Sequence, residues 1–136
     1  MSQTLSLMQE WCDAWSAHDM ARVCAVFTED CVYEDVALGL AHHGHEELTR
    51  FGEEFIKGFP DVKFTLTLKV FDDQRGSAEW RMTGTHLGEV PGMPPPNGGT
   101  CDLRGVSYLE VRDGKIARCS DYTDNVALMR QLGHIS

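Results

Sequence analysis

The chain has 136 residues, of which 42% are hydrophobic and 24% charged, and its formal net charge is −9. This balance is typical of one globular domain, which we expect to span residues 1–136. Lys and Arg are scattered singly, and a phosphate backbone is repelled by the negative charge, so we expect no nucleic-acid binding and no membrane binding. No apolar run approaches the roughly 18 residues that a membrane span needs.

The N-terminus and the cysteines predict a cytoplasmic protein. The first residues show no basic region followed by an apolar one, the pattern of a secretory signal. The five cysteines are odd in number and widely spaced, without a Cys-x-x-Cys pair. Such usage is typical of free thiols in a reducing compartment.

The first part of the chain carries helical patterns around one short strand. Apolar residues at three- and four-residue spacing predict an amphipathic helix over 3–17. Asp19 is placed to cap a second helix that extends to Phe27. A turn at 28–30 then leads into a β-branched and aromatic strand at 31–36.

The second part changes from a helical to an alternating period. Apolar residues from Leu48 to Ile56 predict a third helix, with Glu46 and Glu47 at its N-terminus and Gly58 and Pro60 at its end. Alternation from Val62 to Val70, including Leu68, predicts a half-buried strand. Asp113-Gly114 is a two-residue hairpin signal. The four predicted strands span 62–70, 77–88, 100–112 and 115–123, and a last helix spans 124–132.

The order of these elements predicts an α+β fold whose antiparallel sheet curls into a cone closed by helices. Such a cone holds a pocket for a small hydrophobic or aromatic ligand. Three successive prolines exclude residues 89–99 from a central strand, so we expect a loop there at one end of the sheet. Loops in that position often border binding sites.

Alternation places Cys119, Asp121 and Thr123 on one face of the last strand. If that face lines the pocket, burial raises the pKa of Asp121 toward the range of a general base. The alternative is a solvated carboxylate at a strand end. Asp124 lies close by, and we expect it to cap the last helix.

Trp80, Met82 and His86 share one face of the 77–88 strand. His86 in the pocket would hold a substrate carbonyl or relay a proton, whereas the alternative is a half-buried histidine with one hydrogen bond. Trp80 and Trp15 would stack on a flat substrate, and the alternative for both is core packing.

Tyr33 and Asp35 share a face of the 31–36 strand, where Asp35 is a second candidate carboxylate at the pocket mouth or a solvated one. His42, His43 and His45 precede a helix without a partner cysteine pair or a His-Glu-x-x-His pattern, so we expect no metal site. Of these histidines, His45 is the one expected to reach the pocket.

Several segments together carry a family resemblance. In chain order they are AWSAHD, VFTEDCVYED, GHEEL, FPDVKF, EWRMTGTHLGEVPGMPPPNGG, DLRGVSYLEVRDGKIARCSDYTD and ALMRQLG. They span nearly the whole chain, which resembles the SnoaL-like polyketide cyclases and ester cyclases of the nuclear transport factor 2-like fold.

The resemblance implies a cone-shaped α+β domain that forms a homodimer through its exposed sheet face and needs no cofactor. In cyclases of this family an aspartate near the end of the last strand acts as acid and base on an aromatic polyketide ester. Asp121 occupies that place here. The function expected from the resemblance is therefore ring closure by intramolecular aldol attack.

Two other functions remain open at this level. A cone of this kind also serves as a ligand-binding or dimerisation domain without turnover. The segment VSYLEVRDGKIARCSDYTD also looks like that of limonene-epoxide hydrolases, which combine the last-strand aspartate with an Arg-x-Asp on an earlier strand. The nearest stretch here is Glu79-Trp80-Arg81-Met82, and no Arg-x-Asp is present.

Overall fold

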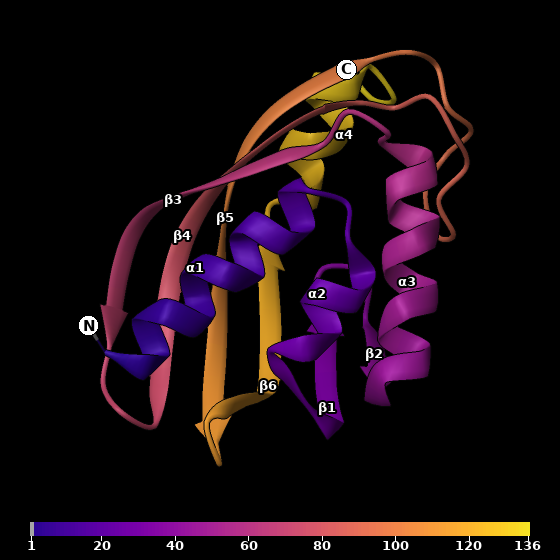
Figure 1. Cartoon of the computed structure of the whole chain (residues 1–136). Coiled ribbons are helices and arrows are strands. Elements are labelled where there is room, and N and C mark those ends of the chain that lie inside the picture. Colours follow the sequence, from indigo (N-terminus) through magenta and orange to yellow (C-terminus); the bar gives the residue numbers. More distant parts are fainter. Residues whose placement is uncertain (1) are drawn as a thin grey trace.

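The computed structural model describes residues 2–136, which form four helices and six strands (Figure 1). In chain order these are α1 (Gln3–Ser16), α2 (Met20–Ala25), β1 (Phe27–Asp35), β2 (Leu40–His43), α3 (Gly44–Gly58), β3 (Lys63–Phe71), β4 (Arg75–Thr85), β5 (Thr100–Arg112), β6 (Lys115–Thr123) and α4 (Asn125–Leu132). The predicted α+β class is confirmed.

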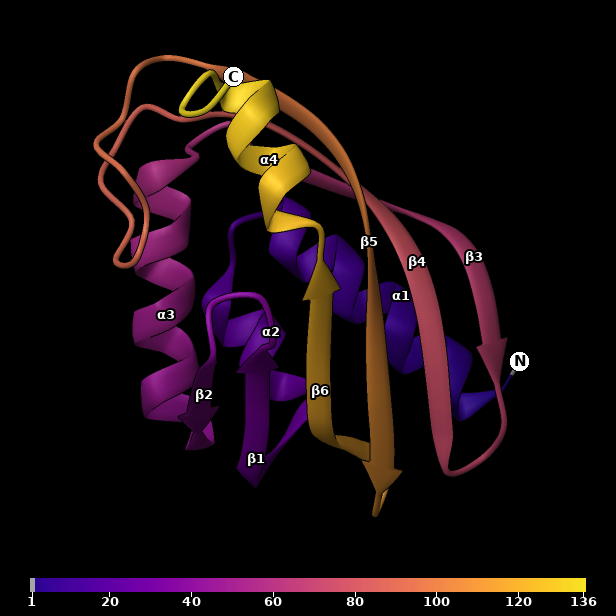
Figure 2. The ribbon, with the colours of Figure 1, turned by 180° about the vertical axis from the view of Figure 1, so that it is seen from behind.

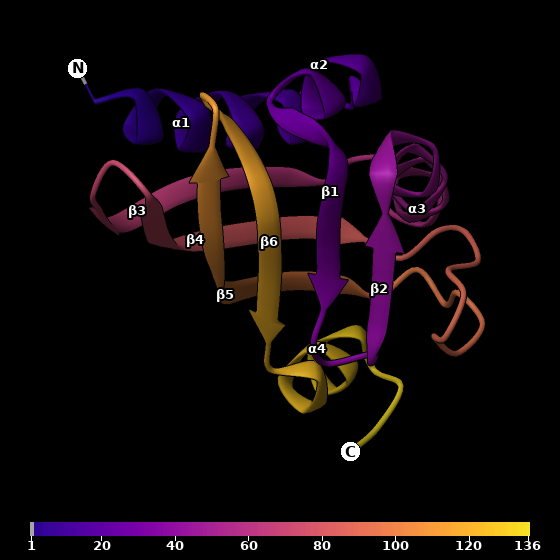
Figure 3. The same ribbon diagram turned by 90° about the horizontal axis from the view of Figure 1, so that it is seen from below.

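All six strands belong to one curled, unclosed sheet in the order β2-β1-β6-β5-β4-β3. Viewed from below, β3, β4 and β5 run crosswise to β1, β2 and β6 over much of their length (Figure 3). The four strands from β3 to β6 form the predicted antiparallel meander. One ladder differs, because β1 and β6 are parallel. The connection between them runs through β2, α3 and the strands β3 to β5, which gives the long crossover that parallel neighbours require.

The helices cover the concave face of the sheet. The first helix, α1, packs against β3 and β4, and α3 packs against β1 and β2. Seen from behind, the strands face the viewer and α1 and α2 lie beyond them (Figure 2). Met8, Cys12 and Trp15, which belong to the predicted apolar stripe of α1, are buried, and so is Trp11 beside that stripe. None of the helices in residues 2–136 has the length and apolar composition of a membrane span.

The start of β1 differs from the sequence prediction. Phe27 was assigned to the second helix and 28–30 to a turn, but both belong to β1. Phe27 is fully buried and pairs with Ile116, and the register shifts before Val32. This irregular stretch interrupts the strand pattern, so it looked like a turn. The short edge strand β2 was not predicted, because four residues are too few to show a period.

The alternation along β3 breaks in its second half. Leu68 and Val70 were expected to point inward but are 66% and 70% exposed. A register shift between Leu66 and Leu68 sets Leu68 opposite Glu79. The side chains next to Glu79 on β4, Ala78 and Trp80, are buried and belong to the other face. A shift of one residue moves all following side chains to the other face.

Gly105 on β5 is required by the packing of Trp80, its partner on β4. A Cβ at Gly105 would lie 2.3 Å from the indole ring. We expect Gly105→Ala to lower the free energy of unfolding by roughly 1–3 kcal/mol, because overpacking forces side chains from their rotamers. Urea unfolding measures this. Gly84→Ala on β4 is the control, since its Cβ would meet no atom closer than 3.3 Å. Equal losses for the two variants would contradict the packing argument.

Candidate active site

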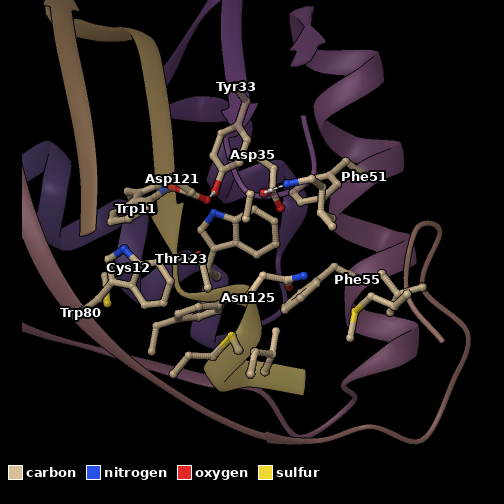
Figure 4. A pocket seen from close by; sticks show the side chains of 18 residues that line it. Trp11, Cys12, Tyr33, Asp35, Phe51, Phe55, Trp80, Asp121, Thr123 and Asn125 are labelled. Carbon is tan, nitrogen blue, oxygen red and sulfur yellow. Dashed lines mark hydrogen bonds between the residues drawn. The ribbon is translucent and has the colours of Figure 1, made fainter. Parts of the chain in front are cut away.

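A cavity of about 90 Å3 lies between α1, α3, the start of α4 and the concave face of the sheet (Figure 4). Seven aromatic side chains line it: Trp11, Trp15, Tyr33, Phe51, Phe55, Phe64 and Trp80. Its two carboxyl groups belong to Asp35 and Asp121. Figure 4 shows both of them beside Tyr33, on the wall formed by β1 and β6.

Asp121 is held in one orientation by donors from three strands. Tyr33 on β1 donates its hydroxyl hydrogen to Oδ2, and Ser107 on β5 donates to Oδ1. The Cys119 thiol lies 3.7 Å from Oδ1. These bonds satisfy the carboxylate, so that an ionised group can exist in a largely apolar cavity.

Ser107 is itself positioned by Trp80. The Trp80 Nε1 donates to Ser107 Oγ across 2.9 Å, and the serine is fully buried. The sequence analysis missed Ser107, because its role depends on the register of β5 against β6. In the structure Ser107 lies directly opposite Asp121.

Burial raises the pKa of Asp121 to about 6. The hydrogen bonds from Ser107 and Tyr33 favour the ionised form and oppose this rise, while the negative charge of Asp35 adds to it. The residue is half-buried, and it lines a cavity whose walls are largely apolar. A carboxyl with this pKa is a usable general base near neutral pH.

Asp35 faces Asp121 across the β1–β6 ladder. Its Oδ1 accepts a hydrogen bond from the backbone N–H of Leu38 at 3.1 Å. Burial raises the pKa of Asp35 despite that bond. Tyr33 lies on the same strand, and burial together with the nearby Asp121 charge raises its pKa well above the ordinary value. Tyr33 therefore remains a phenol that donates to Asp121.

Six of the eight predicted site residues line this one cavity: Tyr33, Asp35, Trp15, Trp80, Met82 and Asp121. His86 does not. It is fully buried, stacks on Phe59 with ring centroids 5.0 Å apart, and its Nδ1 lies 3.0 Å from His134 Nε2. The strand ladder of β4 ends at Thr85, before the predicted end. The curl of the sheet has carried the chain past the cavity at this point.

His45 also lies outside the cavity. It sits in the first turn of α3, where its Nε2 is 3.0 Å from the carbonyl oxygen of Phe27. His42 stacks on Phe51, with centroids 4.4 Å apart. Within residues 2–136 no group of three or more His, Cys, Asp or Glu side chains is arranged to hold a metal ion. Asp124 caps α4 through the N–H of Ala127, as expected.

Several lining residues were not identified from the sequence. Phe51 and Phe55 lie one turn apart on α3, and Trp11 lies beside the predicted stripe of α1. Val90 and Met93 come from the 89–99 loop, which therefore forms part of the wall. The spacing of Phe51 and Phe55 was visible in the sequence, but it identifies a buried helix face and not what that face encloses.

We expect Ser107→Ala to raise the pKa of Asp121 above about 6, because the variant removes a donor that favours the ionised carboxylate. Carbon-detected NMR titration measures the shift, with Asp121→Asn for assignment. Ser77→Ala on β4, outside the cavity lining, is the matched control and should leave the titration unchanged. An unchanged pKa in Ser107→Ala would show that this hydrogen bond is not made in solution.

The raised pKa also predicts how stability depends on pH. An unfolded aspartate titrates near pH 3.9, whereas Asp121 in the folded state titrates near 6. The folded state therefore binds the Asp121 proton more tightly than the unfolded state does. The free energy of unfolding falls as pH rises from about 4 to about 6, because this proton is lost. Above pH 6 the ionised Asp121 lowers the free energy of unfolding by about 3 kcal/mol. Relative to wild type, Asp121→Asn should gain about 2–3 kcal/mol between pH 4 and pH 7.5 in urea unfolding. A difference independent of pH would mean an unperturbed carboxyl.

One family model matches nearly the whole chain. The SnoaL-like polyketide cyclase family matches residues 6–132. A curated relative, the phenazine biosynthesis protein PhzA1 of Pseudomonas aeruginosa, is 27% identical over 95 residues. That stretch covers 69% of this chain and 56% of the relative, so the match spans little more than half of the relative's length.

Solved structures share the fold at low identity. A protein assigned to the SnoaL-like polyketide cyclases, from Jannaschia sp. CCS1, superposes with a TM-score of 0.87 at 19% identity, covering 98% of this chain and 94% of that one. A protein of ketosteroid isomerase-like fold from Catenulispora acidiphila, solved with trimethylamine, gives 0.79 at 20% identity, with 93% and 92% covered. The match over residues 6–132 shows that this chain belongs to the SnoaL-like polyketide cyclase family.

Proposed function

We propose that the protein is a cofactor-independent acid–base enzyme that acts on a small hydrophobic or aromatic carbonyl compound, as a polyketide ester cyclase does. The observation that carries this proposal is the Asp121 carboxylate, which has a pKa of about 6 and lines an aromatic cavity. General bases work best when their pKa lies near the working pH.

In the proposed reaction the Asp121 carboxylate removes a proton from the carbon next to a substrate carbonyl. The electron pair of that C–H bond forms an enolate, whose carbon attacks a second carbonyl of the same molecule. A carbon–carbon bond closes the ring, and the resulting alkoxide takes the proton back from Asp121. Ser107 and Tyr33 hold the carboxylate in place through both transfers.

The size of the cavity bears on the substrate. At about 90 Å3 it is smaller than the engineered cavity of about 150 Å3 that binds benzene. A fused-ring ester therefore needs a wall to move outward. Val90 and Met93 lie on the 89–99 loop, outside the strands of the sheet, and Val90 packs against Gly58 at the end of α3. We include opening of this loop in the proposal.

Proton abstraction can be tested before the true substrate is known. Aromatic β-keto esters are incubated with the protein in D2O, and deuterium uptake at the activated carbon is followed by mass spectrometry. We expect uptake above buffer, with a rate that rises with pH to about 6 and then levels off. Asp121→Asn should lower the rate about a hundredfold or more.

The matched control is Asp124→Asn, because asparagine caps a helix about as well as aspartate does. This variant should exchange at the wild-type rate. If Asp121→Asn exchanges as fast as wild type, Asp121 is not the base. If the wild-type protein binds some of the esters but catalyses deuterium exchange on none, the result favours a ligand-binding domain without turnover.

The second candidate is a ligand-binding domain without turnover. It is supported by the small size of the cavity and by the trimethylamine found in a relative of the same fold. Asp121 would then only bind a ligand. Epoxide hydrolysis is less well supported, because Arg81 is exposed and pairs with Asp102 outside the cavity.

We also propose that two copies pair through the outer face of the sheet. Val106 on β5 and Tyr122 on β6 are neighbours in the ladder, and they are 38% and 51% exposed. Apolar side chains exposed side by side are typical of an interface. The cavity lies on the opposite, concave face, so such a dimer leaves it open.

A further inference from the structure

The charges around the cavity are of one sign. Its lining contains the carboxylates of Asp35 and Asp121, and none of the lining residues identified in residues 2–136 is a Lys, Arg or His. In the described part of the chain, the salt bridges all involve other acidic residues. A ligand that enters the cavity therefore meets negative charge and no cationic side chain.

The two carboxylates are also close to each other. Asp35 and Asp121 are directly opposite on neighbouring parallel strands. Ionising both in apolar surroundings is unfavourable, because each loses hydration and each repels the other. The groups that face them are the Tyr33 phenol on β1, the Cys119 thiol on β6 and His42 on β2. A positive charge brought in by a ligand would offset this repulsion.

The remaining walls suit the same kind of ligand. Cations are attracted to the negative faces of aromatic rings, most strongly to Trp. Trp15 lies at the centre of a ring cluster, with centroids of Tyr33, Phe51, Phe55 and Phe64 between 6.2 and 6.4 Å away. This combination of aromatic walls and carboxylates is complementary to an organic cation and disfavours an anion.

We propose that the cavity binds an organic cation, a compact alkylammonium group held against Asp35 and Asp121 by the aromatic walls. At about 90 Å3 the closed cavity excludes a large ring system, and a quaternary ammonium head with a tail relies on the same opening of the 89–99 loop that the proposed function includes. The inference rests on the cavity of the proposed function but not on turnover. No cationic side chain lines the cavity to stabilise the enolate of the proposed reaction. If that reaction takes place, a basic amine on the substrate would supply this positive charge.

The test compares choline with its uncharged carbon analogue, in which carbon replaces the quaternary nitrogen. The two have nearly the same size and shape, so their difference reports charge. Isothermal titration calorimetry on the wild-type protein at pH 8 should show choline binding about tenfold tighter than the analogue. The preference should fall as pH drops to 5, because Asp121 becomes protonated.

Variants locate the effect in the cavity. Asp35→Asn and Asp121→Asn should each lower the affinity for choline about tenfold and leave that for the carbon analogue unchanged. Asp73→Asn removes the same charge from an exposed turn and should change neither. If the Asp121 variant fails to fold, the choline preference of the wild-type protein between pH 8 and pH 5 still tests the proposal.

Equal affinity of the two probes at pH 8, or no binding of either, overturns the inference. So does a choline preference that Asp73→Asn lowers as much as the cavity variants do. Preferential binding of choline without deuterium exchange on any ester would support the cation site and count against the proposed reaction. Deuterium exchange on an ester, together with equal affinities for choline and its carbon analogue, would support the proposed reaction and contradict the cation site.

Discussion

An ionisable carboxyl in an aromatic cavity is the constraint on which the rest of this structure depends. A carboxylate withdrawn from water costs several kcal/mol unless donors surround it. Here Ser107 comes from β5 and Tyr33 from β1, on either side of Asp121 on β6. Trp80 on β4 then supplies the donor that orients Ser107. Four of the six strands thus contribute to one functional group, with β4 acting through Ser107.

This arrangement depends on an irregularity in the β5–β6 hairpin. The register shifts by one residue between Glu110 and Val111. If the register set by the Arg112–Lys115 pair continued without this shift, Ser107 would lie opposite Ser120 and not opposite Asp121. The Ser120 hydroxyl donates to Glu34 on β1, the strand on the other side of β6. Bulges near functional sites commonly aim a side chain in this way.

The same cavity is a source of instability. Burial raises the pKa of both Asp35 and Asp121, so each carboxylate disfavours the folded state when it ionises. A fold selected for stability alone would place apolar residues there. The retention of two carboxyls among aromatic rings is therefore an argument for function, since stability is commonly sacrificed at such sites. Acid–base chemistry and cation binding would both use this unfavourable charge.

The sequence by itself determined the α+β class, the order of most elements, the cap at Asp124 and the face of β6 that carries Asp121. Each of these follows from a local period or from residues adjacent in the chain. It also predicted six of the residues that line the cavity, five of them because alternation sorts the two faces of a regular strand. The family resemblance then singled out Asp121 among several acidic residues.

Only the tertiary structure decided which residues meet. His86 shares a face with Trp80, yet the curl of β4 carries it past the cavity to Phe59. The register shifts that turn Leu68 outward and set Ser107 opposite Asp121 leave no periodic signal, because a single extra residue is not a pattern. Curl and register are properties of strand pairs and of the whole sheet, and a local reading of one strand does not contain them.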